Sequence, residues 1–130
     1  MGRHALGFLL VFIGGGIGSM LRHASNQAGS ALFGPDFPYG TIFVNLIGSL
    51  AIGLIAGWFA LHGSGGQMLS LFLITGIIGG FTTFSAFTLD TALMWERGQS
   101  VRAGLYVLGS TIPGVIAVFF GLSITRSLVK

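Results

Sequence analysis

Residues 79–87, GGFTTFSAF, interrupt a long hydrophobic stretch with glycine, hydroxyl and aromatic residues. Hydrocarbon offers no partner for a freed peptide group, so an irregular backbone at membrane depth is tolerated only inside protein or beside a water-filled path. The stretch therefore predicts a helix broken near its middle, and a functional site at the break.

The composition around this stretch is that of a membrane protein. The 130 residues are 52% hydrophobic and only 7% charged, whereas a soluble domain has roughly 25% charged residues. Long uncharged runs predict four spans at about residues 5–24, 38–61, 68–96 and 101–126. We therefore expect an all-α membrane protein in which residues 1–130 form a single four-helix transmembrane domain with a broken third helix.

Several function classes are not expected. Four helices leave no residues for a catalytic or nucleotide-binding domain, so the chain is not expected to be an enzyme. The absence of cysteine excludes disulfide and thiolate chemistry. The isoelectric point near 10.2 comes from six Lys and Arg against three acids, nearly all at span ends where basic residues anchor helices to headgroups. No nucleic-acid partner is predicted.

The basic residues divide equally between the two sides of the predicted membrane domain. The side with both termini and the predicted turn at 63–67 carries Arg3, Arg126 and Lys130, and the opposite side carries Arg22, Arg97 and Arg102. Because the positive-inside bias sets orientation, a balance of three against three predicts dual topology and an antiparallel pair. The alternative is a protein oriented by its N-terminal charges alone.

Glycine and turn-forming residues predict how the helices are joined and packed. Residues 24–36 are rich in turn formers and predict a loop before Pro38, which suits a helix start. Three glycine pairs four residues apart, the spacing that lets helix backbones touch, predict close packing. They are Gly14/Gly18, Gly53/Gly57 and Gly76/Gly80.

Three spans carry polar or aromatic lines at helical spacing. They are Thr41, Asn45 and Ser49 in the second, Phe84 and Phe87 in the third, and Tyr106 and Ser110 in the fourth. Hydrogen bonds between helices are one explanation, which we accept for Ser49 alone. For the combined lines we favour a hydrated path, because polar groups within membranes cluster along pathways.

The chemistry of these lines suits an anion. Amide and hydroxyl groups can donate, and phenyl ring edges are the positive rim of the quadrupole. Acids and bases are missing from the predicted span interiors, so a proton relay or a carboxylate ring is not expected. Arg22, at the expected end of the first span, either attracts anions at a vestibule or extends to the headgroups. The predicted solute is a small anion or a neutral polar molecule.

The chain resembles the Fluc (CrcB) family of fluoride channels over nearly its whole length. The residues that carry the resemblance are the 79–87 stretch, Gly40, Thr41, Val44, Asn45 and Leu46, Gly14, Gly15, Leu21 and Arg22, and Tyr106 and Ser110. The resemblance implies an antiparallel, dual-topology homodimer in the cell (inner) membrane. It also implies two pores, lined by both subunits, for passive fluoride export.

Residue roles follow from the resemblance. It implies that the ring edges of Phe84 and Phe87 contact fluoride, that Asn45 donates from its amide, and that backbone carbonyls of Gly79 and Thr82 hold a structural Na⁺ between subunits. It further implies a polar lining of Thr41, Thr83, Ser85, Tyr106 and Ser110, with Arg22 at the vestibule. Asp90 occupies a position that is often acidic in the family, or is simply a helix-end carboxylate. Gly114 lacks a hydroxyl that some relatives carry there.

Two other functions are known for small helical membrane proteins. A small four-helix, dual-topology multidrug exporter would need a membrane-embedded Glu in its first span, and residues 5–21 contain no acid. A non-conducting membrane subunit held together by glycine packing would not need Asn45 or the interrupted third span.

Overall fold

The computed structural model describes residues 2–63 and 66–129, and within them the chain is helical without strands. The helices are α1 (Arg3–Phe33), α2 (Tyr39–His62), α3 (Gln67–Ser70), η2 (Leu71–Ile78), α4 (Gly79–Phe81), α5 (Ser85–Glu96) and α6 (Ser100–Leu128). The four consecutive segments from α3 to α5 together form the third span, Gln67–Glu96. Within these two ranges, four spans are long and apolar enough to cross a membrane, which confirms the predicted all-α membrane fold.

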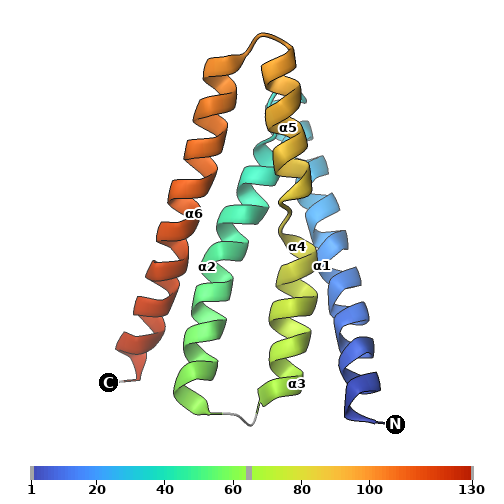
Figure 1. The fold of residues 1–130 in the computed structure, drawn as a ribbon, viewed down its shortest axis with the longest axis vertical. Helices are drawn as coiled ribbons and strands as arrows, with labels where there is room; N and C mark the ends of the chain where they lie inside the picture. Colours follow the sequence, from blue (N-terminus) through green and yellow to red (C-terminus); the bar gives the residue numbers. More distant parts are fainter. Residues whose placement is uncertain (1, 64–65, 130) are drawn as a thin grey trace.

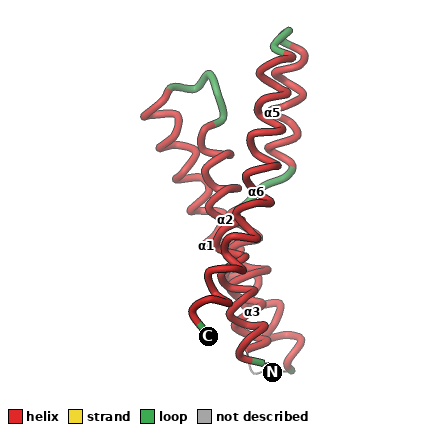
Figure 2. Tube along the Cα trace, turned by 90° about the vertical axis from the view of Figure 1, so that its left-hand side faces the viewer, coloured by secondary structure: helices red, strands yellow, loops and turns green. Residues whose placement is uncertain are grey.

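The spans lie side by side, with both ends of the chain at the same end of the bundle (Figure 1). The third span packs mainly on α1, and α2 packs mainly on α6. At the end opposite the termini, α5 and α6 diverge from α1 and α2 (Figure 2). Arg3 and Arg126 thus lie at the terminal end, as predicted, while Lys130 lies outside the described residues.

Glycines form the contact between α1 and the third span. A Cβ placed on Gly14 would lie 2.6 Å from the carbonyl oxygen of Phe72 and 3.0 Å from the Cα of Gly76. One on Gly18 would overlap the carbonyl oxygen of Ile77, and one on Gly80 would overlap that of Gly15. The two backbones therefore touch, as small residues four apart allow.

A second glycine contact joins α2 to α6. A Cβ on Gly53 would lie 3.1 Å from the Cα of Val118, and one on Gly121 would lie 2.8 Å from the backbone nitrogen of Leu54. A Cβ on Gly57 would lie 2.9 Å from the Cβ of Thr125, whose hydroxyl donates to the Leu54 carbonyl at 3.0 Å. The predicted close helix packing is confirmed at both contacts.

The first helix is longer than expected. The turn predicted over residues 24–36 is wrong for residues 24–33, because α1 continues to Phe33. The polar residues there satisfy helical geometry: the Ser25 hydroxyl, for example, donates to the Leu21 carbonyl at 2.9 Å. The helix ends where Gly34 adopts a positive φ of 84° and donates to the Ser30 carbonyl. Pro35 follows directly.

The third span is interrupted where the sequence predicts. Residues 82–84, called the break below, separate α4 from α5, and Thr82 is extended at φ −85° and ψ 160°. The segment before the break, η2, is a π-helix. Sequence reasoning missed this, since apolar residues such as those of η2 fit either helix type. π-Helical segments are rare and occur frequently near functional sites.

The glycine contact yields a paired stability test. Gly18→Ala should lower the free energy of unfolding by about 1–3 kcal/mol, because its methyl group meets the Ile77 carbonyl and forces α1 and η2 apart. Gly16→Ala, on the same helix with nothing within 4 Å of its Cβ, should leave stability nearly unchanged. Thermal unfolding of both variants in detergent measures the difference. Equal stability of the two variants would contradict the proposed backbone contact between α1 and η2.

Candidate functional site

The break in the third span is held by one side chain from α2. Asn45 accepts the backbone N–H of Thr83 on its Oδ1 at 2.8 Å and donates from Nδ2 to the Thr83 carbonyl at 3.0 Å. The amide therefore pairs with both polar groups of a single peptide residue, much as a neighbouring strand would. One of its two Nδ2 hydrogens remains available.

A second side chain starts the helix after the break. Thr83, which is buried, accepts the N–H of Ala86 on its hydroxyl oxygen at 3.2 Å. A hydroxyl bonded three residues ahead is the usual cap of a helix N-terminus. On the other side of the break, the Thr82 hydroxyl donates back to the Ile78 carbonyl at 3.0 Å. The two neighbouring threonines therefore terminate α4 and begin α5.

These bonds release two backbone carbonyls. In a continuous α-helix the N–H of Thr83 would go to the carbonyl of Gly79, and that of Ala86 would go to the carbonyl of Thr82. Both N–H groups are instead taken by side chains, those of Asn45 and Thr83. Gly79 and Thr82, the two residues expected to offer carbonyls to a cation, thus each lose their helical donor. Gly79 is also exposed on the surface of the chain.

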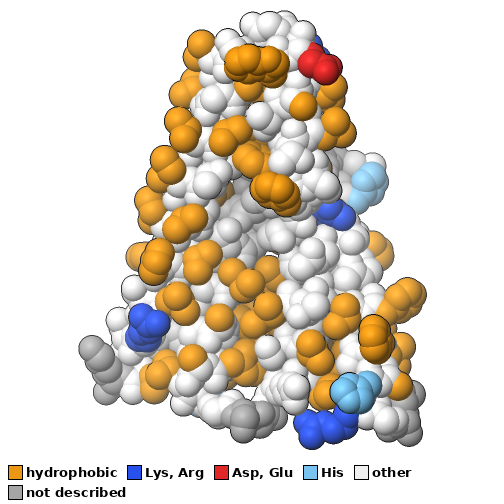
Figure 3. All heavy atoms as spheres, viewed as in Figure 1, with side chains coloured by type: hydrophobic (Ala, Val, Ile, Leu, Met, Phe, Trp, Pro, Cys, Tyr) orange, Lys and Arg blue, Asp and Glu red, His pale blue; other side chains and the backbone are white. Residues whose placement is uncertain are grey.

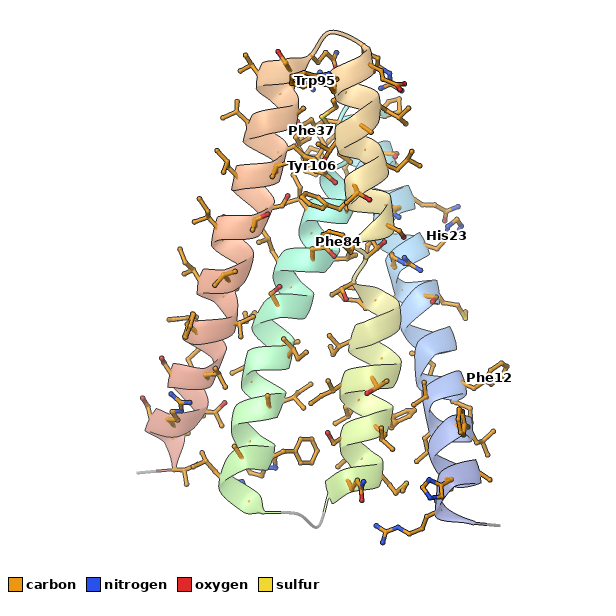
Figure 4. All side chains as sticks on the ribbon, viewed as in Figure 1. Phe12, His23, Phe37, Phe84, Trp95 and Tyr106 are labelled. Carbon is orange, nitrogen blue, oxygen red and sulfur yellow. The ribbon has the colours of Figure 1, made fainter. Side chains whose placement is uncertain are left out.

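Aromatic rings form a continuous line from the break towards the end of the bundle. The Phe84 and Phe87 ring centroids lie 6.1 Å apart, Phe87 lies 5.1 Å from Tyr106, and Tyr106 lies 5.6 Å from Phe37 in an edge-to-face arrangement. Phe84, Tyr106 and Phe37 are seen one above another between α5 and α6 (Figure 4). Phe84 is 77% exposed, whereas Tyr106 is only 1% exposed.

A groove of about 420 Å³, the central groove below, lies beside the break. The third span, α2 and α6 form its walls, and this face of the molecule is hollowed near its middle (Figure 3). The groove brings together the predicted site residues Asn45, Thr82, Thr83, Phe84, Phe87 and Ser110. Ser110 is 8% exposed, and its hydroxyl oxygen is buried without a hydrogen-bond partner in the described part of the chain.

A second cavity of about 330 Å³, the outer cavity below, lies where α5 diverges from the connection between α1 and α2. Its lining includes Thr41, Asp90 and Arg97. The Tyr106 hydroxyl donates to Asp90 Oδ2 at 3.0 Å. Tyr106 thus bonds to the wall of the outer cavity while its ring contacts Phe87 of the central groove, which links the two spaces.

Some predicted site residues line neither space. Ser85 is exposed, and its carbonyl accepts the Thr88 hydroxyl. Arg22, expected at the end of the first span, instead lies inside α1, which continues to Phe33. Asp90 does line the outer cavity, and it lies inside α5, which continues to Glu96. Asp90 lies within the predicted third span, 68–96, but its hydrogen bond to Tyr106 was not predicted.

Sequence reasoning missed other residues of the site. Ser49 and Thr111 line the central groove, whereas the sequence analysis assigns Ser49 to a hydrogen bond between helices. The guanidinium carbon of Arg102 lies 5.1 Å from the centre of the Phe37 ring, within cation–π range. The spacing of Ser49, one turn after Asn45, was the available signal for that residue.

The arrangement favours passage of a solute over catalysis. The central groove offers neutral donors and aromatic rings between apolar walls such as Ile52, Val115 and Val118. Among the described residues there is no group of three or more His, Cys, Asp or Glu side chains that could hold a metal ion. Any cation at the break would therefore depend on backbone oxygens, which hard cations accept.

Comparison with known proteins gives a consistent result. Residues 9–122 match the family described as "CrcB-like protein, Camphor Resistance (CrcB)". The chain is 50% identical over 123 residues to fluoride-specific ion channel FluC 2 of Nitrobacter hamburgensis, covering 95% of this chain and 99% of that protein. It is 52% identical over 121 residues to fluoride-specific ion channel FluC of Rhodopseudomonas palustris strain BisB5, covering 93% and 98% respectively.

A similar protein from Mesorhizobium japonicum, also named fluoride-specific ion channel FluC, is 50% identical over 120 residues and is covered to 96% of its length. Both the matched family and these relatives span nearly the whole four-helix domain. The chain therefore belongs to the CrcB family.

Proposed function

We propose that this multi-pass membrane protein is a fluoride-specific ion channel and that fluoride passes along the central groove. The observation that carries the proposal is the set of neutral donors there, above all the Ser110 hydroxyl and the second Nδ2 hydrogen of Asn45, neither of which has a partner among the described residues. The names of the relatives identify the ion. The channel is passive and exports fluoride that has accumulated in the cell.

Neutral donors suit an ion that must both enter and leave. Fluoride is small and strongly hydrated, so a path has to replace its water with other donors. Conduction requires that this binding be favourable enough for entry and weak enough for release. Amide and hydroxyl groups meet both conditions without a fixed positive charge. The ring edges of Phe84 and Phe87 add weak positive potential beside them.

The antiparallel, dual-topology homodimer remains part of the proposal. Two features of the single chain support a partner at membrane depth. Gly79 is exposed with its carbonyl released, which lipid alone would leave unsatisfied. Phe84 is largely exposed although it lines the groove, so a second subunit is needed to enclose the path. The balanced Lys and Arg tally supports the opposite orientations, and symmetry then gives two pores.

A structural Na⁺ on the dimer axis also fits the residues present. The Gly79 and Thr82 carbonyls have both lost their helical donors, and two such pairs would offer four oxygens to one hard cation. The ion would supply positive charge that joins the two breaks. This chain's own contribution is to keep both carbonyls out of the helix through Asn45 and Thr83.

The other two functions have less support. The exporter would need an acid in the first span, and α1, Arg3–Phe33, contains neither Asp nor Glu. A subunit that only packs would not need a buried hydroxyl beside a groove, such as that of Ser110, with no partner in the part of the chain that the structure describes.

Replacing one ring tests the groove as the path. Phe84→Ile should reduce fluoride efflux from proteoliposomes to the protein-free background, because isoleucine has no positive ring edge. Phe12→Ile is the matched control, since Phe12 is 78% exposed on α1, away from the groove. A fluoride electrode records the release, and gel filtration confirms equal assembly. Normal flux in Phe84→Ile would exclude this ring from the mechanism.

The orientation can be tested in cells. The two sides of the membrane domain carry three Lys and Arg residues each, so neither orientation is favoured. A reporter fused to the C-terminus should therefore give signal from both sides of the membrane. Ser127→Lys adds a fourth positive charge at the terminal end and should shift the signal towards the cytoplasm. A single orientation of the unmodified chain would disprove dual topology while leaving fluoride conduction to be decided by efflux.

The sodium proposal predicts ion-dependent stability. The melting temperature in detergent should be higher in Na⁺ than in N-methylglucamine. Thr83→Val keeps the side-chain shape but removes the oxygen that accepts Ala86 N–H, so this N–H can return to the Thr82 carbonyl. The Na⁺-dependent rise should therefore shrink in Thr83→Val and persist in Thr83→Ser. An equal rise in all three proteins would show that these carbonyls do not hold the ion.

A further inference from the structure

Among the residues that the structure describes, Ser49 does not make the helix-internal hydrogen bond that several other Ser and Thr residues make. Five others donate to the carbonyl one turn back, at 2.9–3.1 Å: Ser25, Thr82, Thr91, Thr125 and Ser127. In this way the hydroxyl groups of Ser and Thr form hydrogen bonds within their own helix. No corresponding bond is found for Ser49 in the described part of the chain, and Ser49 instead lines the central groove. Its hydroxyl is thus available to a solute.

The opposite wall supplies a second free hydroxyl. Ser110 of α6 lines the same groove, and its oxygen is buried without a partner among the described residues. A buried hydroxyl without a hydrogen bond costs free energy, so its retention in a groove suggests a ligand or water there. Ser49 and Ser110 therefore face one space from two helices, each with a donor to offer.

Gly114 keeps this space open. It lines the groove one turn beyond Ser110, and a Cβ placed on it would lie 3.6 Å from the Ser49 Oγ. That distance is ordinary van der Waals contact, so a small side chain would fit without moving the helices. It would, however, fill the volume beside the Ser49 hydroxyl. The space left by the missing side chain at Gly114 of α6 is therefore next to the hydroxyl of Ser49 on α2.

We infer that Ser49 and Ser110 form a second anion station in the central groove, beyond Asn45, and that Gly114 provides the room for it. The ligand is a small, hard anion, or the water that accompanies it, held by two neutral O–H donors. Ser49 lies one turn after Asn45 on the same helix. An ion released by the Asn45 amide can therefore bind next to the Ser49 hydroxyl without passing a purely apolar stretch of the groove. This inference rests on the proposed function, because it extends the fluoride path.

Four variants test the station in proteoliposomes with a fluoride electrode. Ser49→Ala should lower the fluoride efflux rate about fivefold, as expected for the loss of one hydrogen bond. Ser49→Thr keeps the hydroxyl and should remain near the wild-type rate. The double variant Ser49→Ala with Gly114→Ser should recover most of the lost rate, since the new hydroxyl enters the same volume. Ser127→Ala removes a hydroxyl outside the groove and should have no effect.

The outcomes separate this inference from the proposed function. Wild-type protein that releases no fluoride would overturn the channel itself. If the wild type conducts, a wild-type rate in Ser49→Ala overturns the station. So does a loss in Ser49→Ala that neither Ser49→Thr nor the double variant reverses, because the hydroxyl would then not be the relevant group. Gel filtration and melting temperatures should match the wild type throughout, since a packing role for Ser49 would alter them.

Discussion

The requirement that peptide groups be satisfied inside a membrane governs this structure. Interrupting a helix at that depth exposes N–H and C=O groups that lipid cannot bind. Here the Asn45 amide takes both polar groups of Thr83, and the Thr83 hydroxyl takes the N–H of Ala86. The interruption is thus stabilised from within the chain, and it leaves two carbonyls, those of Gly79 and Thr82, without their helical donors. The proposed cation site is a direct product of how the break is held.

Asn45 therefore has a role that the expected solute contact does not describe. Both of its heavy polar atoms are engaged by the backbone of the third span, and only one hydrogen is left for a passing anion. The same side chain fixes the groove wall and contributes to its interior. A solute that bonds to this hydrogen is held at a fixed position relative to Phe84 and Phe87, because all three are tied to the break. Such rigidity favours a constant geometry over adaptation to different ions.

Much of the fold could be predicted from the sequence, because hydrophobic length and glycine spacing have direct physical consequences. The four spans, the interrupted third helix and the close glycine contacts were all expected. The end of α1 was not, since single polar residues such as Ser25 bond within a helix as readily as in a turn. The π-helix was missed because apolar composition does not distinguish helix types. The partner of Asp90 and the place of Ser49 in the groove were not predicted, because each depends on a neighbour from another helix, Tyr106 or Gly114, that no spacing along one segment can reveal.

The glycine contact between α1 and the third span has an evolutionary consequence. Gly14 and Gly18 meet the backbone of η2 and α4, while Gly80 meets the backbone of α1. Neither helix can gain a side chain at these positions unless the other retreats, and a retreat of the third span would pull Thr83 away from Asn45. Mutations on a helix that does not line the central groove are thereby coupled to the residues that do. Amino-acid substitutions in α1 are therefore limited by the need to keep the central groove intact, although α1 does not line the groove.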